Sequence, residues 1–178
     1  MCMQKTPWQA AAEFHGHVCP GLAIGYRAAE AAVRSLGPGR DTDEEMVAIV
    51  ENDSCAVDAI QFLTGCTVGK GNLIFRNYGK QVYTIGRRSD GRAVRVALKY
   101  GGMPAGDTKE ERVNNIMHAP LEDLFDVREV QLELPPKAVI FKTVQCAECG
   151  EGVMEARARL REGKTVCPAC FEEYTGGW

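Results

Sequence analysis

Two histidines and a cysteine are concentrated within five positions near the N-terminus. His15, His17 and Cys19 occupy alternate positions, so in an extended segment their side chains would project from one side of the backbone. Imidazole and thiolate are ligands that borderline-soft divalent metals prefer. The spacing therefore predicts a metal or catalytic site. The alternative is a helix–loop junction whose histidines only cap and pack.

Two cysteines are predicted to stand at the start of a helix. Pro20 suits the first position of a helix, which places Cys19 at the N-cap. Residues 52–54, Asn-Asp-Ser, supply capping side chains in front of a second helix that begins at Cys55. Free backbone N–H groups at a helix N-terminus stabilise a thiolate. Both cysteines are therefore predicted to be poised to form thiolates.

Four further cysteines form two C-x-x-C pairs near the C-terminus. Cys146 and Cys149 are separated from Cys167 and Cys170 by the 17 residues 150–166. This spacing predicts a tetrahedral zinc site, and four thiolates leave no position for a substrate, so the zinc would be structural. A hairpin between the pairs and a short helix opened by Pro168 would make this a treble-clef zinc finger. A redox dithiol is the competing interpretation.

The glycine-rich segment 65–72 contains a cysteine and a lysine that can do chemistry. Lys70 can help such a loop to cradle an anion, but the segment lacks the phosphate-loop spacing. Cys66 is a candidate nucleophile, as is Cys55. An enzyme that uses Cys55 or Cys66 as its nucleophile would need a pocket that holds Lys70 or Asp58 within reach of a bound metal.

The elements that must position these residues are helices and mostly hairpin-connected strands. The order lacks regular βαβ alternation, which favours an α+β fold with a mixed or antiparallel sheet packed with helices. We expect a core domain over residues 1–144 and the treble-clef finger over 145–178. The expected helices span 6–15, 20–36, 55–64 and 108–118, and the expected strands span 45–51, 73–76, 80–87, 92–100, 127–134 and 138–144.

Composition limits the classes of protein. Of the 178 residues, 45% are hydrophobic and 25% charged, as in ordinary globular domains. A net charge of −3 gives no general attraction for nucleic acid. No apolar run approaches the roughly 18 residues of a membrane span, and no secretory signal is recognisable. Eight cysteines in such a chain indicate metal or redox chemistry in the cytoplasm.

Three segments together resemble the FmdE family, named for the E component of formylmethanofuran dehydrogenase: Phe14–Gly25, Asp53–Gln61 and Thr64–Leu73. The resemblance implies an α+β core, frequently dimeric, and an association with the molybdenum or tungsten enzyme that starts carbon dioxide reduction in methanogens. Other components of that enzyme carry out the reaction. On the matching positions, His17, Cys19 and Cys55 would form a core metal set, with His15 as an additional member. The C-terminal module resembles the finger that some members carry.

Three functions are compatible with these patterns. The first is an accessory metalloprotein of one-carbon or molybdenum/tungsten enzyme metabolism, in which an open core site binds zinc or another divalent transition metal. Such a protein is expected to be a homodimer whose finger contacts a protein partner. The second is a metal-dependent enzyme with a cysteine nucleophile. The third, a nucleic-acid-binding regulator, is disfavoured by the acidic balance.

Overall fold

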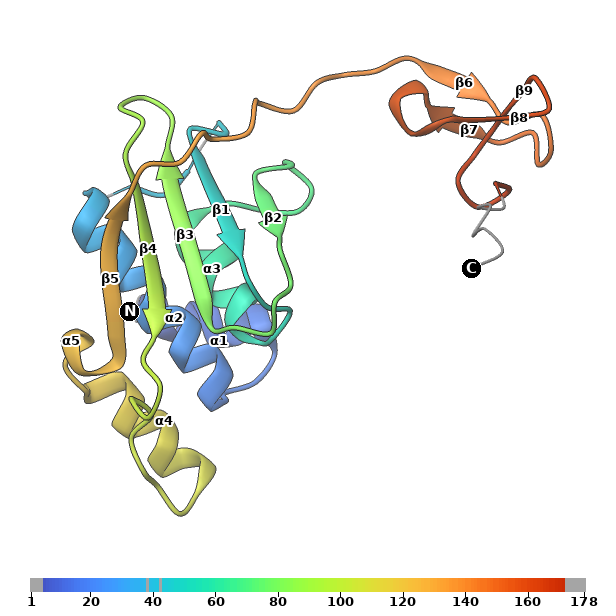
Figure 1. Cartoon of the computed structure of the whole chain (residues 1–178). Helices are drawn as coiled ribbons and strands as arrows, with labels where there is room; N and C mark the ends of the chain where they lie inside the picture. The colour runs from blue at the N-terminus through green and yellow to red at the C-terminus, as the bar shows by residue number, and fades with distance from the viewer. Residues whose placement is uncertain (1–4, 38, 42, 172–178) are drawn as a thin grey trace, which may run out of the picture. The chain divides into compact units, whose positions relative to one another are not determined.

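A five-stranded mixed sheet underlies the N-terminal part of the chain (Figure 1). The computed structural model describes residues 5–171 except 38 and 42. The strand order is β2-β1-β3-β4-β5, in which β1 and β2 are parallel and the other neighbours antiparallel. The strands are β1 Met46–Val50, β2 Leu73–Phe75, β3 Val82–Arg87, β4 Ala93–Leu98 and β5 Phe125–Val130.

Helices cover one face of this sheet, with α1, α2 and α3 lying behind the strands in Figure 1. All five β1 residues are buried, as predicted for a strand covered on both faces. Three of them, Met46, Ala48 and Val50, join the main core cluster together with residues of α2 and α3. The mixed sheet packed with helices confirms the α+β prediction. The helices are α1 Pro7–His15, α2 Pro20–Leu36, α3 Ala56–Thr64, α4 Lys109–His118 and α5 Leu121–Leu124.

Helices α1 and α4 each begin with a capping box. Thr6 and Gln9 form a reciprocal capping box at α1, and Thr108 with Glu111 forms another at α4. Pro120 prevents α4 from continuing, as predicted, and then precedes the short helix α5, which was not predicted. None of the helices within the described ranges is long and apolar enough to cross a membrane.

Helices α2 and α3 approach each other unusually closely, because α2 carries glycine where they cross. A Cβ on Gly25 would overlap the carbonyl oxygen of Ala56 and lie 2.6 Å from the Cα of that residue. One turn earlier, a Cβ on Gly21 would lie 3.2 Å from the Cβ of Cys55. Glycine therefore brings the N-terminal ends of two helices, each preceded by a cysteine, into contact.

The two strands predicted around Pro135 and Pro136 differ from the structure. The fifth strand of the sheet ends at Val130, and residues 131–142 form no strand. Proline lacks the N–H that a sheet ladder needs. The segment is instead held by other contacts. Leu134 packs on Gly86, and the Arg88 side chain donates to the carbonyl of Pro135.

The chain separates into two compact units between Ala138 and Val139. The predicted boundary, at 144/145, lies six residues later. The difference arises because β6 (Thr143–Gln145), expected to end the core domain, pairs with β7 (Gly152–Met154) in the second unit.

The second unit is built from two short hairpins. The pair β6–β7 is followed by the 3₁₀ helix η1 (Glu155–Arg157) and by the pair β8 (Arg159–Arg161) and β9 (Lys164–Val166). A turn, not a helix, spans residues 168–170. Residues 172–178, on which the predicted treble-clef helix and Tyr174 fall, lie outside the described residues, so the treble clef stays a prediction.

Candidate metal centres

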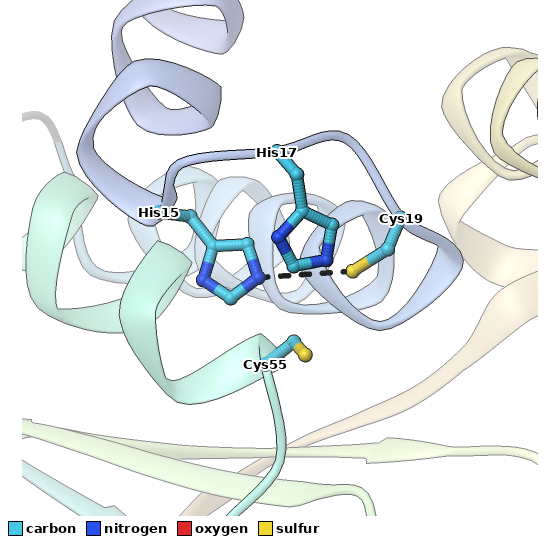
Figure 2. Close-up of side chains that lie close together, drawn as sticks. All are labelled: His15, His17, Cys19 and Cys55. Atoms are coloured by element: carbon cyan, nitrogen blue, oxygen red, sulfur yellow. Dashed lines mark hydrogen bonds between the residues drawn. The ribbon is translucent and has the colours of Figure 1, made fainter.

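The structure brings His15, His17, Cys19 and Cys55 together in one cluster (Figure 2). His15 is the last residue of α1, and Gly16 ends that helix in the left-handed conformation at φ 91°. Cys19 and Cys55 occupy the N-cap positions of α2 and α3. Each side chain offers one donor atom, and the four atoms all lie within 4.8 Å of one another.

His15 is the most firmly held of these side chains. Its Nδ1 lies 2.7 Å from a carboxylate oxygen of Asp58, and only 9% of its side chain is exposed. A carboxylate accepts hydrogen bonds, so Nδ1 carries the proton and Nε2 is free to bind a metal. That Nε2 lies 3.9 Å from the Cys19 sulfur. The resemblance made His15 only an additional member of the set, whereas the geometry gives it a carboxylate support typical of metal-binding histidines.

The two thiols differ in their surroundings. The Cys19 sulfur accepts a hydrogen bond from the backbone N–H of Leu22 at 3.3 Å, as expected for an N-cap. Cys55 makes no side-chain capping hydrogen bond. Burial and the neighbouring Cys19 thiol raise the pKa of Cys55. Burial and the Cys19 thiol therefore oppose the effect on the Cys55 pKa that a helix N-terminus was predicted to have.

The donor set fits a tetrahedral transition metal. Two imidazoles and two thiols are typical zinc ligands, with bonds of about 2.0–2.3 Å that place the ligand atoms about 3.3–3.8 Å apart. The 3.9 Å separation between the His15 nitrogen and the Cys19 sulfur lies close to the upper end of this range. A bound metal would supply the positive charge that stabilises both thiolates in this partly buried site.

The other catalytic candidates lie outside the cluster. Cys66 is completely buried, and this burial raises the pKa of its thiol to about 11. The ammonium group of Lys70 pairs with the carboxylate of Asp41, which also accepts the backbone N–H of Met46. Both side chains serve the packing beneath the 65–72 loop. Cys66 is not one of the four residues of the core metal cluster.

The C-terminal cysteines form a second cluster, as their spacing predicts. One sulfur from each of Cys146, Cys149, Cys167 and Cys170 lies within 4.8 Å of the others. The backbone N–H groups of Cys149 and Cys167 lower the pKa of Cys146 to about 6. The neighbouring thiols raise the pKa of Cys170 to about 12. Four thiols this close ionise together only when a cation joins them.

The arginines of the second unit do not form a uniform basic face. Arg157 lies in η1, whereas Arg159 and Arg161 lie in β8, so the three do not share one strand. The guanidinium of Arg161 pairs with Glu148 at 2.9 Å and donates to the carbonyl of Cys170. This pairing compensates the charge of Arg161 within the unit.

Replacing Asp58 tests whether the carboxylate supports the core cluster. We expect Asp58→Ala to weaken metal binding there by about 10- to 100-fold, because His15 loses the acceptor that orients its ring. Competition with a chromogenic chelator measures the affinity. Asp58→Asn, which keeps an acceptor oxygen, should lose less. Equal metal affinities for the two variants and the parent chain would show that Asp58 does not support metal binding at the core cluster.

Comparisons with known proteins cover both units. Residues 14–126 match the family model described as "FmdE, Molybdenum formylmethanofuran dehydrogenase operon". Residues 140–176 match the "Prokaryotic dksA/traR C4-type zinc finger". The first match contains all four ligands of the core cluster, and the second contains all four cysteines of the other.

Two individual proteins are similar to most of this chain. A probable S-adenosyl-L-methionine-binding protein of Archaeoglobus fulgidus is 33% identical over 92% of the chain. The chain spans only about half, 52%, of that relative's length. A tungsten formylmethanofuran dehydrogenase FmdE-like protein from Syntrophus aciditrophicus, known from its crystal structure, is 28% identical. Its TM-score is 0.69, and the match covers 89% of this chain and 86% of that one.

Proposed function

Because the chain belongs to the FmdE family, we propose that it is a metal-binding accessory protein of one-carbon or molybdenum/tungsten enzyme metabolism. The observation that carries the proposal is the cluster of two histidines and two cysteines in the family-matched unit. The core cluster would hold zinc or another divalent transition metal, and the four-cysteine cluster a structural zinc.

An accessory role is favoured over an enzyme with a cysteine nucleophile. Cys19 and Cys55 are both committed to the metal cluster, and Cys66 is buried with a raised pKa. Within the described residues, the structure leaves no activated thiol free beside the cluster. S-adenosylmethionine binding is not part of the proposal, because about half of the relative so named lies outside the match.

The proposal includes three properties that follow from the family resemblance and the finger. The protein would act in the cytoplasm as a homodimer, and its finger would contact a protein partner. The finger match and the internal pairing of Arg161 with Glu148 support a protein rather than a nucleic acid as that partner.

Metal analysis of the purified chain tests the proposal. We expect two metal ions per chain, because each cluster supplies four donor atoms. The double variant Cys19→Ala/Cys55→Ala should keep only the finger ion, and Cys146→Ala/Cys149→Ala only the core ion. A parent stoichiometry of one, lost entirely with the finger cysteines, would refute the core site.

A further inference from the structure

The two thiols of the core cluster lie close enough to react with each other. The sulfurs of Cys19 and Cys55 are within 4.8 Å of one another (Figure 2). A disulfide requires a separation of about 2.05 Å between its sulfurs. Rotation of one cysteine side chain from one staggered rotamer to the next moves its sulfur by about 3 Å. A rotamer change of this size spans the gap between the two sulfurs.

Glycines of α2 leave room for the two thiols to meet. Gly25 allows the starts of α2 and α3 to come into contact, because a Cβ there would overlap the backbone of Ala56. A Cβ on Gly21 would lie 3.8 Å from the Cys19 sulfur and 4.0 Å from the Cys55 sulfur. Since glycine has no such atom, both sulfurs border the same uncovered stretch of backbone, over which one can move toward the other.

The two thiols differ in their freedom to move and in their access to solvent. The backbone N–H of Leu22 donates to the Cys19 sulfur, and Cys19 is only 8% exposed. Cys55 makes no side-chain capping hydrogen bond and is half-buried. Among the described residues of the N-terminal unit, the remaining cysteine, Cys66, is completely buried and lies outside the cluster. A reagent from solvent therefore meets Cys55 first, and Cys19 is the thiol in place to react next.

We propose that Cys19 and Cys55 form a redox switch, in which a low-molecular-mass disulfide oxidises them to an internal disulfide and the core site then no longer binds a metal. The internal disulfide removes both thiolates and leaves His15 and His17 as the only donors of the cluster. Zinc sites in proteins keep at least three protein ligands. The inference deepens the proposed function and rests on it, because the metal that the switch controls is the core ion.

The oxidation proceeds by two thiol–disulfide exchanges. The Cys55 thiolate attacks one sulfur of the oxidant, and the other sulfur of the oxidant leaves as a thiolate. The Cys19 thiolate then attacks the Cys55 sulfur and expels the second half of the oxidant. One S–S bond breaks and one forms, and the oxidant gains the two electrons that the cysteine pair loses. The two protons of the cysteine thiols end on the two released thiols, so an excess of that thiol reverses the reaction.

Equilibration of the full, zinc-loaded chain with 2-hydroxyethyl disulfide and 2-mercaptoethanol tests the switch. The samples are alkylated, digested with trypsin without reduction and analysed by mass spectrometry. We expect the peptide 6–27 to be joined to the peptide 41–70 through Cys19 and Cys55. Fragmentation of the joined peptides distinguishes Cys55 from Cys66, which lies in the same peptide. A chromogenic indicator should detect one zinc ion per chain more than the oxidised Cys19→Ala/Cys55→Ala variant releases, because that variant holds the finger ion alone.

Added zinc should oppose the oxidation, because it binds the reduced pair and not the disulfide. With free zinc at about 100 times the Kd of the core site, half-oxidation should require about a 100-fold higher ratio of disulfide to squared thiol concentration. His17→Ala keeps both thiols and removes one metal ligand, so it should require less oxidant than the parent chain at the same zinc concentration. A ratio that zinc does not change would contradict the switch.

The outcomes separate this inference from the proposed function. A mixed disulfide on Cys55 that never passes to Cys19, or a core ion that stays bound after the internal disulfide has formed, overturns the switch while the proposed function stands. A parent chain that holds no more zinc than Cys19→Ala/Cys55→Ala before oxidation refutes the proposed core site, and the switch with it.

Discussion

Removal of metal from the four-cysteine unit is expected to unfold it while the N-terminal unit stays folded. Among residues 139–171, only Cys146 and Val166 are buried, so this unit has almost no hydrophobic core. Its hairpins β6–β7 and β8–β9 contain three residues per strand. Zinc binding to such a module contributes about 10–16 kcal/mol at neutral pH, which is free energy of folding.

Amide hydrogen exchange before and after chelation measures this effect. The amides of β6 to β9 should lose protection, whereas those of β1 and β3 in the main sheet should keep it, because that sheet is buried against helices. Cys146→Ala/Cys149→Ala should reproduce the loss without a chelator. Continued protection of β8 and β9 in the metal-free chain would show that the hairpins are stable by themselves.

The elements that the sequence predicted best are those with a strong local signal. The helix 20–36 was predicted at its exact bounds, because Pro20 begins it and an alanine-rich stretch continues it. The run 45–51 was correctly assigned to a buried strand. The strand at 138–144 was wrong except at its end, since an apolar run after two prolines had no neighbouring strand to pair with, and Ile140 is 99% exposed.

The core site was only partly visible in the sequence. Alternation placed His15, His17 and Cys19 near one another, but the inclusion of Cys55 in the metal set came from the family resemblance. The support of His15 by Asp58 depends on α1 packing against α3, 43 positions away in the chain. No local pattern encodes this contact. Likewise, Gly25 looked like an ordinary small residue of α2, because a helical glycine does not reveal which backbone approaches it.

Gly25→Ala is expected to destabilise the N-terminal unit by about 3 kcal/mol or more. Alanine is a better helix former than glycine by about 1 kcal/mol, which alone would stabilise α2. The added methyl group, however, would overlap the Ala56 carbonyl oxygen and lie 2.6 Å from the Ala56 Cα. Backbone atoms cannot rotate away, so α2 and α3 must separate, and overpacking of this kind outweighs the propensity gain.

The separation of α2 and α3 should also weaken metal binding at the core cluster. Cys55 directly precedes Ala56, and Cys19 begins the helix that contains Gly25, so moving the helices apart separates the two sulfurs. We expect weaker metal binding at the core cluster with an unchanged finger ion, measured by denaturant unfolding and metal analysis of the same samples. Gly69→Ala is the matched control, because no atom lies within 4 Å of the added Cβ. Equal stability of the two variants would mean that the helix crossing at Gly25 does not determine the geometry of the core cluster.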